Sequence, residues 1–144
     1  VAQLSFQRLD IPNVSQRIGD FKTLFPQVLN EIDQLDLLFI DGDHRAGNSV
    51  DYFEQALTKI HAQSIIFIAD IHWSADMEQG WKKIRQHPRV KLSIDLLHLG
   101  VLFFDESIRE VQHLSLIKWN WKPWHLGLFG QGKIKSKAAA TIDA

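Results

Sequence analysis

The sequence predicts an α/β fold with a mostly parallel sheet followed by an antiparallel hairpin, and three observations lead to it. Short apolar runs without polar alternation are typical of strands covered on both faces, as in parallel sheets. Segments with apolar residues at helical spacing separate these runs, which favours right-handed strand–helix–strand crossovers. Two β-rich runs joined by a short corner follow the last such helix.

Three apolar runs are the expected parallel strands. Residues 14–18 form a weak run between a Pro-Asn turn and Gly19. Residues 35–40 and 64–69 form strong runs rich in Leu, Ile and Phe. Each run should end at one edge of the sheet, where open parallel sheets bind their ligands.

Apolar stripes predict helices between and after these strands. The first covers 24–32, where Pro26 is tolerable only in the first turn because proline donates no backbone hydrogen bond. The second covers 50–60, and Asn48 or Ser49 is its expected N-cap.

The third helix and the hairpin complete the predicted fold. Ser74 is the expected N-cap of a helix that ends at His87-Pro88. Residues 90–97 and 100–104 form the expected antiparallel pair, and 111–117 is a candidate for one further strand. The folded domain is therefore expected to span residues 1–117.

Composition excludes several classes of protein. The chain has 144 residues with 16 Lys+Arg against 17 Asp+Glu, so its charge gives no footprint for nucleic acid or an anionic membrane. The absence of cysteine excludes disulfides, thiolate metal sites and a cysteine nucleophile. No apolar stretch approaches the ~20 residues of a membrane span, and no signal peptide opens the chain, so we expect a cytoplasmic protein.

The two ends of the chain have distinctive features. The sequence begins at Val1 rather than Met, which favours a chain trimmed from something longer. Residues 118–144 form an aromatic-rich extension that opens with three Trp and two Lys in KWNWKPW. This segment is either an interfacial patch or a set of aromatic side chains that pack back onto the domain, and base rates for exposed apolar surface favour the second.

Each of the three predicted parallel strands is followed by an aspartate: Asp20, Asp41 and Asp70. Carboxylates on one edge can accept hydrogen bonds from hydroxyls or amines, ligate Mg²⁺, or raise one another's pKa for acid–base work. A single aspartate at such a position is usually a turn or cap residue. The cluster, with Asp41-Gly42-Asp43-His44 directly after a buried strand, favours a functional site.

Histidines follow two of these aspartates. His44 has an ordinary pKa near neutrality, which suits a general base, but a lone histidine in a turn is more often bonded to backbone. The same alternative applies to His72, beside the entry of the third helix. No His-Glu-x-x-His pair, Gly-x-Ser-x-Gly elbow or Walker-type loop is present, which argues against a zinc enzyme, a serine hydrolase and a P-loop NTPase.

Three segments carry a family resemblance: LDLLFIDGDHRAGNSVDYFEQAL, SIIFIADIHWSADMEQGWKKI and VKLSIDLLHLGVLFFDE. Together they resemble the second half of class I S-adenosylmethionine-dependent methyltransferases, and more narrowly the bacterial small-molecule O-methyltransferase-like group. The resemblance covers roughly residues 14–117. It implies a Rossmann-like doubly wound sheet whose first two strands, with their Gly-rich cofactor loop, are missing here, so that 35–40 becomes an exposed sheet edge.

The resemblance also implies roles for individual residues. Asp20 and Phe21 match the turn that contacts the adenine of the cofactor, and Asp41 and Gly42 match the strand end that lines its methionine side. In the metal-dependent relatives, the positions of Asp41 and Asp70 bind a divalent metal such as Mg²⁺, and the position of His44 holds a basic catalytic residue. A third ligand follows the second aspartate in those relatives, and this chain has Ile71 there, which cannot coordinate.

The resulting expectation is an S-adenosylmethionine-dependent methyltransferase, present as a truncated chain, that transfers a methyl group to a small hydroxylated molecule. His44 or Asp41 would then lie near the accepting hydroxyl. One alternative is a non-catalytic module that kept the fold and forms homo-oligomers through the exposed sheet edge. A third interpretation, a metal-dependent hydrolase, would use Asp41, Asp43, Asp70 and His44.

Overall fold

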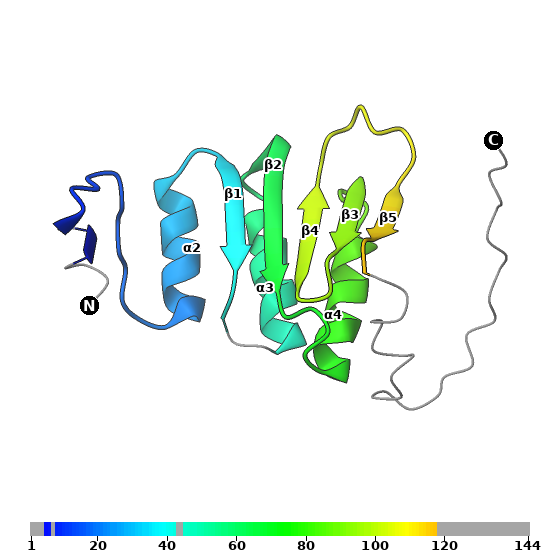
Figure 1. Cartoon of the computed structure of the whole chain (residues 1–144). Helices are drawn as coiled ribbons and strands as arrows, with labels where there is room; N and C mark the ends of the chain where they lie inside the picture. Colours follow the sequence, from blue (N-terminus) through cyan, green and yellow to red (C-terminus); the bar gives the residue numbers. More distant parts are fainter. Residues whose placement is uncertain (1–4, 7, 43–44, 118–144) are drawn as a thin grey trace, which may run out of the picture.

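The sheet is the centre of the fold in the computed structural model, which describes residues 5–6, 8–42 and 45–117. It has five strands in the order β1-β2-β4-β3-β5 (Figure 1). The strands are β1 (Leu35–Ile40), β2 (Ile60–Ala69), β3 (Leu92–Asp95), β4 (Leu99–Phe103) and β5 (Gln112–Ser115).

Four of these strands run in the same direction. β1 pairs parallel with β2, and β3 pairs parallel with β5. β4 lies between β2 and β3 and is antiparallel to both. The α/β fold with its C-terminal hairpin, and the further strand near 111–117, are therefore confirmed.

Three helices accompany the described part of the sheet: α2 (Phe21–Glu31), α3 (Ala46–Ala56) and α4 (Ala75–Arg85). α3 and α4 pack side by side on one face of the sheet, and α2 lies beyond the β1 edge (Figure 1). Each helix begins at the edge where β1, β2 and β3 end (Figure 1). α2 precedes β1 and runs antiparallel to it, whereas α3 follows the end of β1 and α4 follows the end of β2.

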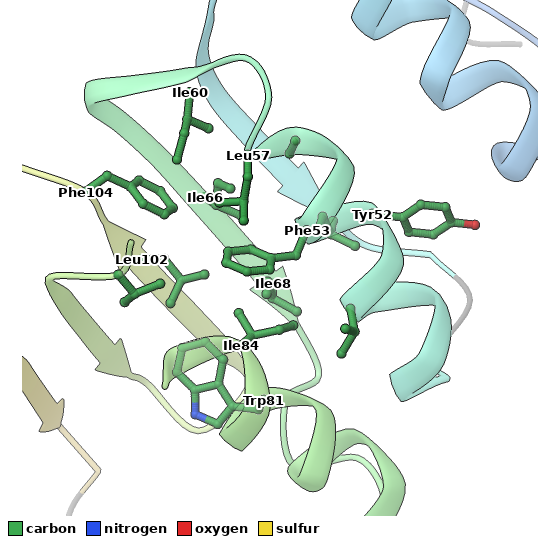
Figure 2. Packing of buried hydrophobic residues seen from close by; sticks show 14 of the residues in the cluster. Tyr52, Phe53, Leu57, Ile60, Ile66, Ile68, Trp81, Ile84, Leu102 and Phe104 are labelled. Carbon is green, nitrogen blue, oxygen red and sulfur yellow. The ribbon is translucent and has the colours of Figure 1, made fainter. Parts of the chain in front are cut away.

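The hydrophobic core fills the space between the sheet and the pair α3–α4 (Figure 2). Phe53 of α3, Ile66 and Ile68 of β2, and Leu102 of β4 are all at most 1% exposed. Burying a side chain of this size contributes roughly 1.5–3 kcal/mol. Strands rich in Ile and Leu therefore supply one wall of the core, and the helical stripes supply the other.

Two glycines permit the closest approaches in this core. A Cβ at Gly80 of α4 would lie 2.8 Å from the Cβ of Ala46, so the two helices touch at this point. A Cβ at Gly100 of β4 would lie 2.6 Å from the Trp81 ring, which covers the strand there. Both positions need a residue without a side chain.

Three expectations about the first half of the chain are wrong. Residues 14–18 form no strand, and Ile18 is 85% exposed, because the described chain offers this short run no neighbour to pair with. Pro26 lies inside α2 rather than in its first turn. Asn48 and Ser49 lie within α3, which begins at Ala46, so neither is its N-cap.

The third helix matches its prediction closely. Ser74 is the N-cap of α4, and its Oγ accepts a hydrogen bond from the Met77 N–H at 3.1 Å. Acidic residues occupy the first turn and basic residues the last, as the helix dipole favours. In the described residues, no helix is long and apolar enough to cross a membrane. The predicted extension 118–144 lies outside them.

Candidate functional site at the carboxyl edge of the sheet

The ends of the parallel strands bring the predicted aspartates to one edge. Asp41 directly follows β1, and Asp70 directly follows β2. Asp20 is the residue before α2, whose first turn lies at the same edge (Figure 1). The structure thus gathers all three at the edge where the three helices also begin, and helix N-termini favour anionic ligands.

Phe21 and Gly42, both predicted to bind the cofactor, lie against each other. A Cβ at Gly42 would be 3.6 Å from Cε2 of Phe21, which is ordinary van der Waals contact. The Phe21 ring also packs on Tyr52 of α3, with 5.9 Å between ring centroids. Tyr52 points from α3 toward α2 (Figure 2), so the first turn of α2 is held beside the loop after β1.

Asp20 is the N-cap residue of α2, but its side chain does not cap the helix. Its backbone C=O accepts from the Leu24 N–H at 2.9 Å and so begins α2, but its carboxylate accepts no backbone hydrogen bond as a cap. Among the described residues, the Thr23 hydroxyl donates a long hydrogen bond of 3.4 Å to the Asp20 carboxylate. An exposed acidic group is therefore available beside Phe21.

An apolar cavity of about 300 Å³ opens next to Phe21. It lies between residues 15–19, α2 and β1, and its volume is at the lower end of the range for small-molecule sites. Its lining residues are Ser15, Arg17, Gly19, Phe21, Leu24, Phe25, Val28 and Leu38. The run 14–18, wrongly predicted as a strand, thus forms one wall of the cavity.

Asp76 links α4 to the start of α3, which follows Asp41 and Gly42 in the sequence. Its Oδ2 accepts a hydrogen bond from the Ala46 N–H at 2.9 Å, which ties the start of α3 to the first turn of α4. Asp76 is one of the acidic residues in the first turn of α4, and sequence reasoning did not find its bond to Ala46. Gly80, one turn further along α4, was the sequence signal for this close contact between α3 and α4. A glycine inside a helix costs roughly 1 kcal/mol, so it is expected where close packing requires it.

Asp70 adopts an unusual backbone conformation at the end of β2. Its φ is 55°, in the left-handed region that non-glycine residues rarely enter. Its N–H donates to the His98 carbonyl at 2.6 Å, and its own carbonyl accepts from the Trp73 N–H at 2.9 Å. The loop after β2 is thereby fastened to the β3–β4 turn.

His72 and Asp95 form a second link between the same two loops. His72 Nε2 lies 2.9 Å from Asp95 Oδ2, and both side chains are less than 10% exposed. Burial acts to raise the pKa of Asp95, but hydrogen bonds from His72 and the Leu97 N–H, with the charges of His72 and Arg85, hold it below its ordinary value. His72 is thus a buried partner of Asp95, a role that sequence reasoning did not find.

The described residues do not complete the predicted catalytic and metal sets. Asp43 and His44 lie outside them. Within the part that is described, no group of three or more acidic, histidine or cysteine side chains could hold a metal ion. Ile71 has a hydrocarbon side chain with no donor atom, and it is fully buried in the core. The assignments of His44 as catalytic residue, and of Asp41 and Asp70 as metal ligands, stay predictions.

Comparison with known families supports the resemblance found in the sequence. Residues 5–71 match the model of a family described as a methyltransferase domain, over slightly less than half of the chain. No curated protein and no solved structure matches the chain. Residues 5–71 are therefore similar to a methyltransferase domain. The matched stretch runs from before α2 to the residue after Asp70, so it contains every predicted site residue.

Proposed function

We propose that this domain binds S-adenosylmethionine at the carboxyl edge and transfers its methyl group to a small hydroxylated molecule. One observation carries the proposal: the segment that matches the methyltransferase family contains Asp20, Phe21, Asp41 and Gly42, and the fold brings these four residues to one edge. The cofactor, when bound, supplies an electrophilic methyl group on sulfur.

The residues of the edge suit this cofactor in part. Phe21 and the adjoining cavity offer an apolar surface for the adenine, and the Asp20 carboxylate can accept a hydrogen bond from its amine. Gly42 leaves room beside Phe21 that a larger side chain would fill. Asp41 would face the methionine side, where helix N-termini favour the carboxylate of that group.

Methyl transfer of this kind depends mainly on holding the acceptor oxygen in line with the methyl group. His44 would take the proton of the acceptor hydroxyl, since its ordinary pKa lies near neutrality. Asp41 would orient that hydroxyl. No step in this proposal requires a metal. The binding experiment below is done with and without Mg²⁺, because the resemblance implies a metal in some relatives.

A calorimetric titration with S-adenosylhomocysteine, with and without Mg²⁺, tests cofactor binding. Asp41→Ala should weaken binding about tenfold, because a hydrogen bond to a charged group contributes roughly 1.5–3 kcal/mol. Asp33→Ala is the matched control, because Asp33 is an exposed aspartate just before the opposite end of β1. Equal affinities for the two variants would contradict the proposed site, and absence of binding by the unchanged chain would contradict the proposed function.

The alternative of a non-catalytic oligomerising module has one specific observation in its favour. In the described part of the chain, β1 is an edge strand, and Leu37 and Phe39 are 58% and 52% exposed. Exposed apolar edge strands readily pair with other chains. A stable homodimer together with no affinity for S-adenosylhomocysteine would favour this alternative.

A further inference from the structure

The face of the sheet opposite α3 and α4 is apolar from one edge to the other. Paired residues on neighbouring strands point to the same face, so the register defines a transverse row across all five strands. That row consists of Phe39, Phe67, Val101, Ile94 and Leu114. We call this side of the sheet the apolar face.

Of the three described helices, α3 and α4 lie on the other side of the sheet, and α2 lies beyond the β1 edge. α3 and α4 cover Ile66, Ile68 and Leu102, which alternate with the residues of the apolar face. α2 approaches the sheet at Leu38, which also alternates with Phe39. Figure 1 shows the helices behind the sheet and beside β1, with none in front.

Such a face needs a cover. Largely parallel sheets are normally covered on both sides, and large contiguous apolar patches mark contact surfaces. The two edges of this face are the most exposed: Phe39 on β1 is 52% exposed, and Leu114 and Leu116 at β5 are 44% and 65% exposed. We propose that residues 119–129 of the same chain dock on the apolar face.

Composition makes this segment a suitable cover. Six large apolar side chains fall within its eleven residues: Trp119, Trp121, Trp124, Leu126, Leu128 and Phe129. Tryptophan supplies the most contact area of any side chain, and its N–H can still reach a polar partner at a rim. The segment thus carries enough large apolar side chains to cover the apolar face.

Charge complementarity favours the same occupant. Residues 118–144 contain five lysines and one acidic residue, a net charge of +4. The total for the chain is 16 basic and 17 acidic residues, which leaves 11 basic and 16 acidic residues, a net charge of −5, in residues 1–117. Opposite net charges draw residues 118–144 as a whole toward the domain, although only Lys122 lies within 119–129, and the tether to β5 raises the local concentration of the segment.

The chain is also long enough. The described part ends at Ile117, two residues after β5. Crossing from β5 to β1 spans four strand spacings, about 19 Å. Seven extended residues reach about 23 Å, so Trp124 can arrive at Phe39 on the far edge.

Disulfide trapping tests the proposal, because the chain has no cysteine of its own. Phe39→Cys is combined in turn with a cysteine at position 124, 126 or 128, which the chain after Ile117 is long enough to bring to Phe39, and each protein is oxidised at low concentration. Asp51→Cys, on the exposed side of α3, replaces Phe39→Cys in the control set. We expect an intramolecular disulfide with position 39 for at least one partner, at a rate at least tenfold above the control.

Other results would overturn the proposal. Equal rates at positions 39 and 51, or no cross-link at either, would show that the segment does not dock there. Disulfides only between chains would assign the apolar face to a second copy. A second measurement uses an apolar fluorescent dye: the triple substitution of Trp119, Trp121 and Trp124 by Ser should raise dye binding several-fold, whereas Ser at Lys133, Lys135 and Lys137 should not. Unchanged dye binding in the tryptophan variant would also contradict docking.

Discussion

Gly100 and Trp81 give the sharpest prediction at the scale of single residues. The Trp81 ring lies where a Cβ at Gly100 would be, with carbon atoms at 2.6 Å and 2.7 Å, and Trp81 is only 3% exposed. Gly100→Ala should therefore destabilise the fold by about 1–3 kcal/mol, the range for overpacking a core. Urea unfolding measures this change.

Gly47 provides the matched control for that substitution. It lies in α3, and a Cβ there would meet nothing within 4 Å. Gly47→Ala should leave stability unchanged or raise it by up to about 1 kcal/mol, because alanine favours the helix. A destabilisation equal to that of Gly100→Ala would contradict the packing described for Trp81.

Asp95 gives a pH-dependent prediction. Its pKa is lowered in the folded state, so the unfolded chain binds more protons near that pH, and stability rises with pH there. The contribution of the carboxylate is complete above its ordinary pKa of about 3.9 and is lost as the pH falls through the lower, folded value. Urea unfolding between pH 2 and pH 6 measures it.

Asp95→Asn removes this titration. The variant should be less stable than the parent at pH 6, and the difference should shrink as the pH approaches 2. Asn has one acceptor oxygen for the two partners of Asp95, His72 Nε2 and the Leu97 N–H, so the pH dependence of the difference, rather than its size at one pH, reports on the charge. A difference that stays constant from pH 6 to pH 2 would contradict the role assigned to the ionised Asp95.

At the scale of elements, the link between Asp76 and Ala46 holds the start of α3 against α4. The bond replaces the side-chain cap that α3 lacks, since its N-cap Arg45 makes no side-chain cap hydrogen bond. Asp76→Ala should cost about 1 kcal/mol, the usual value for a lost cap, and should speed amide exchange at Ala46. Asp51→Ala, in the same pair of helices, is the control and should change neither quantity.

Sequence patterns predicted elements better than their beginnings. The stripe of α4 and the Ser74 cap could be read directly, because cap and first turn are adjacent in the sequence. The start of α3 could not, because the acceptor for its first N–H is 30 residues away on α4. The run 14–18 failed for a similar reason: a strand needs a neighbour, and a single sequence does not say whether one is present.

At the scale of the whole molecule, strand direction explains why the site could be predicted in part. Four strands that share one direction must end at one edge, so the aspartates that follow β1 and β2 could be placed together from the sequence. The link between His72 and Asp95 joins the loop after β2 to the hairpin, across 23 residues, and no local pattern announces it. The position of β1 at an edge of the described sheet agrees with the expectation drawn from the resemblance.

The central claim is that the carboxyl edge binds the methyl-donor cofactor, and amide NMR of the full chain during titration with S-adenosylhomocysteine tests it most directly. We expect the amide signals of Phe21 and Gly42, which lie next to each other at this edge, to shift during the titration. The amide signals of Asp33, just before β1, and Gln63, near the start of β2, should not shift, because both residues lie at the opposite edge of the sheet. Shifts centred on Asp33 and Gln63, or no shifts at saturating ligand, would contradict the account.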